Sequence, residues 1–195
     1  EVGIASIGDC SFRLLRPSAA DHRMQVVAQT VEQMHEFGKP FQLTHTPKSS
    51  DFPRLRAEGK NALVQAVKRC HANKPDMPAD AELYTFEVRE GDLLVLGSDG
   101  FFDNVCDGEL CRLVGEEAHH CGEATDSGRI AATLARAASA RMAEPVGAPN
   151  GADAAEGAPA RPPTPLAARA RCAGMEIPGG VQDDITVVAA WVARA

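Results

Sequence analysis

The chain has 195 residues and a mass of 20.6 kDa, which suits one domain, or one domain with a tail. It carries 20 Lys and Arg against 27 Asp and Glu, a formal net charge of −7. This mild acidity argues against a nucleic-acid-binding protein, which normally presents a basic face. Aromatic residues make up only 5%, so the core must be aliphatic. The longest apolar stretch, residues 185–193, is too short to span a bilayer.

The first half of the chain is typical of closely spaced strands. Apolar alternation predicts strands at 2–8, 11–16 and 23–29, separated by turn residues, and therefore an antiparallel meander. Residues 31–37 are interpreted as one or two helical turns. Apolar residues at helical spacing predict a helix over 60–71.

The second half alternates between clear strand and helix patterns. Residues 83–88 and 93–97 are predicted to form a hairpin, with a second strand apolar enough to be central in a sheet. Asp107 is expected to cap a helix over 108–118, and Ser127 a further helix. A last strand is predicted at 185–192.

Residues 143–170 differ from the rest of the chain in composition. They contain Pro145, Pro149, Pro159, Pro162, Pro163 and Pro165 among Ala, Gly and Arg. Such a composition offers little apolar surface to bury, so the sequence predicts a disordered insertion at 143–170.

A small set of aspartates lies where apolar strands end or begin. The set comprises Asp9, Asp99, Asp103, Asp183 and Asp184. Carboxylates that converge at strand ends repel one another unless a cation neutralises them. A site made of oxygen ligands alone favours Mg²⁺ or Mn²⁺ over zinc. The alternative is that these aspartates only close turns and cap helices, and the residues alone leave both interpretations open.

Three motifs around these aspartates occur in a characteristic order. They are Ile7-Gly8-Asp9-Cys10-Ser11, the run from Leu93 through Asp99-Gly100 to Asp103-Asn104, and Asp183-Asp184-Ile185-Thr186-Val187-Val188. In order and spacing they resemble the later motifs of the metal-dependent (PPM, type 2C) protein serine/threonine phosphatases, which run GDS, then an apolar strand with DG-x-x-D, then DN-I-T-V. The segment 31–43 resembles the mitochondrial and plastid branch of that family, which carries a similar EQ-x-H-x-F-x-x-P-[FY]-QL run.

The resemblance covers most of residues 1–110 and 179–193, and only the later part of the family domain. The family's first half holds a DG-x-GG motif whose aspartate bridges two metal ions, and this sequence contains no DG-x-GG. Residues 1–195 are therefore interpreted as the C-terminal portion of a phosphatase domain. The chain also departs from the family pattern at Cys10, where Ser is frequent, and at Asp184, usually Asn.

The resemblance implies an α+β fold of two stacked antiparallel sheets flanked by helices, an αββα sandwich, with the N-terminal part of the domain absent. It implies that Asp99 and Asp183 bind metal, and that Asp9 and Asp103 contribute to a further, weaker metal site. The expected cofactors are two or more Mg²⁺ or Mn²⁺ ions. The attacking group would be a metal-bound water, so no side chain is expected to act as the nucleophile.

The function implied for the intact protein is hydrolysis of phosphoserine and phosphothreonine on phosphorylated protein substrates, in a mitochondrion or plastid if the branch resemblance extends to location. The first alternative is a non-catalytic phosphatase-like module that binds protein partners. A second is a regulatory or scaffolding domain whose aspartates only close turns. A DG-x-GG motif upstream of residue 1 in the gene would favour the enzyme.

Overall fold

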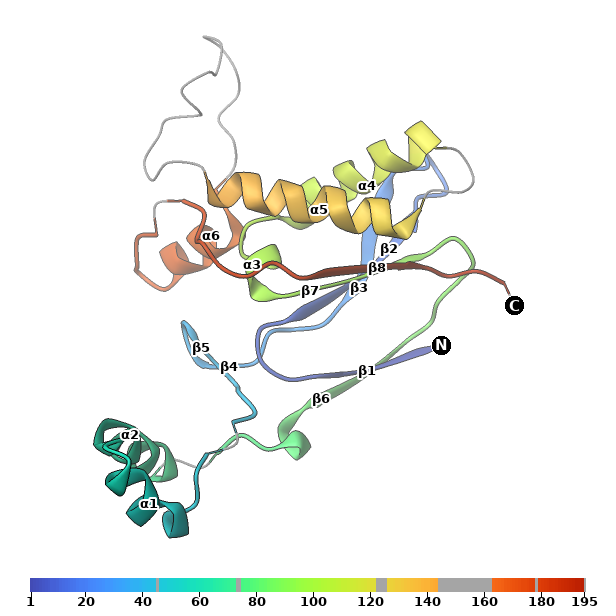
Figure 1. The fold of residues 1–195 in the computed structure, drawn as a ribbon. Helices are drawn as coiled ribbons and strands as arrows, with labels where there is room; N and C mark the ends of the chain where they lie inside the picture. The colour runs from blue at the N-terminus through green and yellow to red at the C-terminus, as the bar shows by residue number, and fades with distance from the viewer. Residues whose placement is uncertain (45, 73–74, 122–125, 144–162, 178, 195) are drawn as a thin grey trace.

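A computed structural model of the chain describes all residues except 45, 73–74, 122–125, 144–162, 178 and 195 (Figure 1). The strands are β1 (Val2–Ser6), β2 (Ser11–Pro17), β3 (Met24–Gln29), β4 (Met34–Glu36), β5 (Lys39–Pro40), β6 (Glu82–Phe86), β7 (Leu93–Gly97) and β8 (Val187–Trp191). The longer helices are α1 (Phe52–Ala57), α2 (Asn61–Ala72), α4 (Asp107–Cys121), α5 (Ser127–Met142) and α6 (Pro165–Cys172). The short helices are η1 (Ser49–Asp51), η2 (Pro78–Asp80) and α3 (Asp99–Phe102).

A four-stranded antiparallel sheet in the order β3-β2-β7-β8 forms the centre of the molecule. The helices α4 and α5 cover one face of this sheet (Figure 1). Leu93 and Val95 of the inner strand β7 are completely buried in one core with residues of these two helices. The same core contains the α5 stripe Ile130, Leu134 and Ala138. The central position expected for residues 93–97 is therefore confirmed.

β1 and β6 form a separate two-stranded antiparallel sheet, in which Ile4 is paired with Tyr84. This sheet meets the other face of the larger sheet, where the rings of Phe12 in β2 and Phe86 in β6 stack with centroids 5.7 Å apart. The hairpin expected between residues 83–88 and 93–97 is wrong. β6 and β7 belong to different sheets, and the connection between them crosses from one sheet to the other.

The α+β class, with antiparallel sheets flanked by helices, is confirmed. The helices α4 and α5 pack on the four-stranded sheet, whereas α1 and α2 pack on each other around Phe52, Leu55, Val64 and Val67 (Figure 1). No helix in the described part of the chain is long and apolar enough to cross a membrane.

Three local expectations differ from the structure. Residues 31–37 contain β4 of a small β4–β5 hairpin, not helical turns, because Gly38 adopts a positive φ of 71° and reverses the chain there. The cap of α5 is Asp126, whose side chain accepts a hydrogen bond from the Gly128 amide at 2.9 Å, and Ser127 is the first helical residue. Asp107, expected to cap the helix over 108–118, is likewise the first residue of α4 and lies inside the helix.

The expected disordered insertion at 143–170 is wrong at its C-terminal end. Residues 165–172 form α6, because Thr164 caps the helix, Pro165 suits its first position, and the following Leu, Ala and Arg residues favour helix. Residues 144–162 lie outside the described part of the chain.

An ion pair anchors the connection between β6 and β7. Arg16 in β2 donates Nε to Asp92 Oδ1 and Nη2 to Asp92 Oδ2, both at 2.7 Å, and the Arg89 amide donates to Oδ2 at 2.7 Å. The Asp92 side chain is only 1% exposed. Burial alone would raise the pKa of Asp92, but Arg16 and the Arg89 amide hold that pKa below its ordinary value.

We expect Arg16→Gln to lower the free energy of unfolding by about 2 kcal/mol at pH 7, because it leaves a buried carboxylate without its cation. A depressed folded-state pKa contributes stability above the unfolded value of about 3.9, and that contribution is lost as pH falls through the folded value. The difference between the two proteins should therefore narrow below about pH 4.

Chemical denaturation between pH 3 and pH 7 measures this difference. Arg23→Gln is the matched control, because Arg23 is 86% exposed and pairs with Asp21 only at 3.6 Å. A loss for Arg16→Gln that stays constant down to pH 3 would exclude the ion pair as its cause.

Candidate metal centre

Three of the predicted site residues gather at one edge of the four-stranded sheet. β2 begins, β7 ends and β8 begins at a single row of paired residues. The row consists of Ser11, Gly97 and Val187. Asp9 lies two residues before this row in the turn between β1 and β2, Asp99 two residues after it as the first residue of α3, and Asp183 in the segment that leads into β8. The antiparallel register therefore brings these three carboxylates to the same edge.

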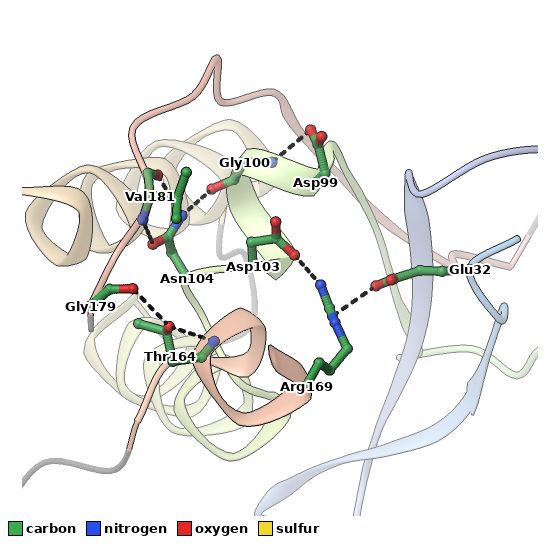
Figure 2. A network of polar contacts seen from close by, with 10 residues as sticks. Glu32, Asp99, Gly100, Asp103, Asn104, Thr164, Arg169, Gly179 and Val181 are labelled. Atoms are coloured by element: carbon green, nitrogen blue, oxygen red, sulfur yellow. Dashed lines mark hydrogen bonds and ion pairs between the residues drawn. The ribbon is translucent and has the colours of Figure 1, made fainter. Parts of the chain in front are cut away.

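The charges of these carboxylates act on one another. Burial raises the pKa of Asp9, and the nearby carboxylates of Asp99 and Asp183 raise it further. Asp99 Oδ1 accepts a hydrogen bond from the Gly100 amide at 2.8 Å (Figure 2), and Asp183 Oδ1 accepts one from the Asp184 amide at 2.7 Å. Each of these two side chains is thus held in place through one oxygen by a local backbone amide.

Asp103 lies at the C-terminal end of α3, beside this group, and contacts a cation from another helix. Arg169 in α6 donates Nη2 to Asp103 Oδ1 and Nη1 to Glu32 Oε1, the latter at 3.1 Å (Figure 2). Burial raises the pKa of Asp103; Arg169 opposes that rise, while Asp99 and Asp9 add to it. Burial likewise raises the pKa of Glu32, against the influence of Arg169. Asp103 therefore belongs to a mixed acidic and basic network.

A buried asparagine joins α3 to the segment that carries Asp183. Asn104 is fully buried, and its Nδ2 donates to Gly100 O at 2.9 Å and to Val181 O at 3.3 Å. Its Oδ1 accepts from the Val181 amide at 3.3 Å (Figure 2). This one side chain satisfies backbone groups on both segments, so it fixes their separation.

Two further close contacts bring the Asp183–Asp184 segment against the end of β7. Ser98 Oγ donates to Asp184 O at 3.0 Å and accepts from the Thr186 amide at 3.0 Å. Gly100 has no room for a side chain, because a Cβ there would lie 2.5 Å from Asp184 O and 3.2 Å from Asp183 Cβ. β8 itself begins only at Val187, so Asp183 and Asp184 lie in the segment before the strand and not at its first residues.

Three members of this arrangement were not predicted from the sequence. Asn104 follows directly on Asp103, and Glu32 lies inside the segment 31–43. Both residues therefore belong to segments that resemble the phosphatase family. Their roles depend on contacts with residues about 77 and 137 positions away, which no local pattern reveals. Arg169 lies in a Pro- and Ala-rich stretch that carries no motif.

The chemistry of the gathered side chains fits a hard divalent cation. Within the described residues no group of three or more His, Cys, Asp or Glu side chains is already arranged to hold a metal ion. However, Asp9, Asp99 and Asp183 offer only carboxylate oxygens, the donors that Mg²⁺ and Mn²⁺ prefer, and their mutual repulsion is what a cation would relieve. Asp103 is engaged by Arg169 instead.

Cys10, next to Asp9, is poorly suited to act as a nucleophile. Partial burial raises the pKa of its thiol, and the carboxylates of Asp9 and Asp99 raise it further. A reactive cysteine needs a lowered pKa, because the thiolate is the attacking species. The Cys10 thiol is therefore a poor candidate for attack on a substrate.

Comparisons with known proteins point to one family. The chain is 27% identical to "Probable protein phosphatase 2C 26" of Arabidopsis thaliana over 98% of its length, and 28% identical to "Probable protein phosphatase 2C 1" of Oryza sativa subsp. japonica over 97%. It is 26% identical to "Protein phosphatase PTC7 homolog fig" of Drosophila willistoni, again over 97%. The solved structure of the photosystem II phosphatase PBCP matches 97% of the chain with a TM-score of 0.62 and 25% identity.

These relatives and the solved structure are type 2C, or PPM, protein phosphatases, and the chain is similar to that family over nearly its whole length. No protein-family model matches it. The chain covers 51%, 44% and 47% of those three relatives, in the order given, and 58% of the PBCP chain. It therefore spans about half the length of the curated relatives it matches.

We expect Gly100→Ala to displace the Asp183–Asp184 segment, because the new Cβ would clash with the backbone of Asp184. Thermal unfolding should show a clear loss of stability, and Mn²⁺ should raise the melting temperature less than it does in the unmodified chain. Gly108→Ala is the matched control, because a Cβ at that helical glycine of α4 meets nothing within 4 Å. Equal effects of the two substitutions would contradict the close approach of α3 to the Asp183–Asp184 segment.

Proposed function

We propose that residues 1–195 form the C-terminal portion of a type 2C phosphatase domain, and that the complete domain hydrolyses phosphoserine and phosphothreonine on proteins. The observation that carries this proposal is the single row across β2, β7 and β8 that brings Asp9, Asp99 and Asp183 to one edge. Similarity to type 2C protein phosphatases supports the reaction class. The absence of DG-x-GG from the sequence, with the half-length match to relatives, supports the assignment to the later part of the domain.

In this proposal Asp99 and Asp183 hold Mg²⁺ or Mn²⁺, and Asp9 adds a third carboxylate to the same centre. When bound, two such ions supply an acidified water and neutralise charge on the phosphoryl oxygens. The chain contributes rigidity: Gly100 and Asp184 amides orient the two ligands, and Asn104 fixes the distance between the segments that carry them. A centre held this firmly loses little energy to reorganisation during the reaction.

The proposed partners are phosphorylated proteins, and the proposed location is a mitochondrion or plastid. The relatives named protein phosphatase 2C support the first inference. Relatives named PTC7 homologs and the photosystem II phosphatase PBCP, together with the branch-like segment 31–43, support the second.

In the complete protein, Asp99→Asn and Asp183→Asn should each reduce phosphatase activity at least roughly 100-fold, because an amide removes a negative charge from a hard-cation site. Asp184→Asn should be mild, since Asp184 acts through its backbone: its carbonyl accepts from Ser98 and its amide donates to Asp183. Without metal, the two damaging variants should melt at the same temperature as the unmodified protein or slightly higher, because repulsion is relieved.

Activity against a phosphopeptide over a range of Mn²⁺ concentrations, with melting curves in parallel, measures these effects. Equal damage from Asp184→Asn and Asp183→Asn would mean that the ligand is assigned one residue out of register. If neither Asp99→Asn nor Asp183→Asn alters the Mn²⁺ dependence, the aspartates only close turns and the proposal fails.

The 195-residue chain assayed by itself should be a poor phosphatase with Mn²⁺, because it carries no DG-x-GG aspartate to bridge two ions. Among the described residues β3 and β8 also form the outer strands of the larger sheet, and exposed outer strands favour association. A phosphopeptide assay of this chain beside the complete gene product tests the point. Full activity of the chain alone would contradict the assignment to a partial domain, and inactivity of both would favour a non-catalytic binding module.

A further inference from the structure

Arg169 bridges two acidic side chains that come from distant parts of the sequence. Its guanidinium contacts Asp103 at the end of α3 and Glu32 in the segment after β3 (Figure 2). Asp103 is 18% exposed, Glu32 17% and Arg169 35%, so the network is largely shielded from solvent. The guanidinium is planar and always protonated, so it supplies a fixed positive charge to both carboxylates.

The helix α6, which carries Arg169, is docked on the rest of the molecule by contacts that do not involve the Arg169 side chain. The Leu166 amide donates to Asp103 O at 3.2 Å, so α6 contacts the same residue through the backbone. Thr164 Oγ1 accepts from the Ala167 amide and donates to Gly179 O, both at 3.3 Å (Figure 2). Ala167 and Ala170 are buried. Arg169 is therefore delivered by a docked helix and not by a loose loop.

The positive charge of Arg169 lies next to a region that carries several negative charges. Asp9, Asp99 and Asp183 already crowd the adjoining sheet edge, and Asp103 and Glu32 extend the same negative region. Partly buried carboxylates in such a region need a nearby cation. At Asp103 and Glu32 the Arg169 guanidinium supplies this positive charge.

We propose that Arg169 takes the place of a divalent ion at Asp103 and Glu32, so that Asp103 is not a metal ligand in this chain. The metal centre is then confined to Asp9, Asp99 and Asp183, and this part of the inference rests on the proposed function. Removal of the guanidinium frees two carboxylates that face one point from different elements, and Mn²⁺ binds there in its stead. Arg169 is a positioning residue that holds Asp103 away from the metal centre.

The experiment is a calorimetric Mn²⁺ titration of the 195-residue chain at pH 7, with melting curves at each Mn²⁺ concentration. Arg169→Gln should bind one more Mn²⁺ per chain than the unmodified protein, with a dissociation constant of the order of 10⁻⁴ to 10⁻³ M, as for weakly built oxygen sites. Arg169→Lys keeps a cation and should gain no site. Arg171→Gln is the matched control, because Arg171 is an exposed arginine on the same helix.

A double variant separates the gained site from a merely structural effect. Asp103→Asn added to Arg169→Gln should abolish the extra Mn²⁺, whereas loss of packing alone would lower stability without creating a metal site. Asp103→Asn alone should leave the Mn²⁺ stoichiometry of the unmodified chain unchanged. This last variant tests the inference even if Arg169→Gln does not fold.

The outcomes distinguish this inference from the proposed function. No additional Mn²⁺ in folded Arg169→Gln, an additional Mn²⁺ that survives Asp103→Asn, or a lower stoichiometry in Asp103→Asn alone would each overturn the role of Arg169. If the unmodified chain binds no Mn²⁺ but Arg169→Gln gains a site that requires Asp103, the role of Arg169 stands while the proposed metal centre fails.

Discussion

The repulsion among carboxylates at one end of β7 is the constraint on which the structure around the site depends. Asp9, Asp99 and Asp183 come from different segments and lie near one another there. Burial raises the pKa of Asp9, and the carboxylates of Asp99 and Asp183 raise it further. Without a cation to neutralise these carboxylates, the fold would be less stable than one with apolar residues at the same positions. The hydrogen bonds and close contacts around these residues keep the carboxylates near one another despite their repulsion.

The contacts that resist the repulsion are mostly neutral hydrogen bonds to the backbone. Asn104, Ser98 and the close approach at Gly100 join α3 to the segment before β8. Arg169 adds charged contacts, with Asp103 and with Glu32. The neutral hydrogen bonds fix the positions of the segments that carry Asp99 and Asp183, while the Arg169 guanidinium pairs with Asp103 and Glu32.

The sequence predicts the elements that bury a continuous apolar pattern and fails where tertiary contacts decide. β7 and the α5 stripe of Ile130 and Leu134 follow from periodicity, and the Asp motifs follow from their order along the chain. The β6–β7 hairpin was wrong because the pairing of β6 with β1 depends on residues about eighty positions away. The helix α6 with Arg169 was not predicted because the segment 143–170 was judged by its overall content of proline. The Thr164 cap is a local signal that begins a helix inside that segment.

Titration of the Asp9 carboxyl with and without Mg²⁺ tests whether a metal centre lies at this edge of the sheet. In metal-free protein the Asp9 carboxyl, followed by ¹³C NMR, should titrate above the ordinary value of about 3.9, because burial raises its pKa and the carboxylates of Asp99 and Asp183 raise it further. Addition of Mg²⁺ should lower that pKa, because a bound cation favours the ionised form. An Asp9 that titrates at its ordinary value and does not respond to Mg²⁺ would contradict a metal centre at this edge of the sheet.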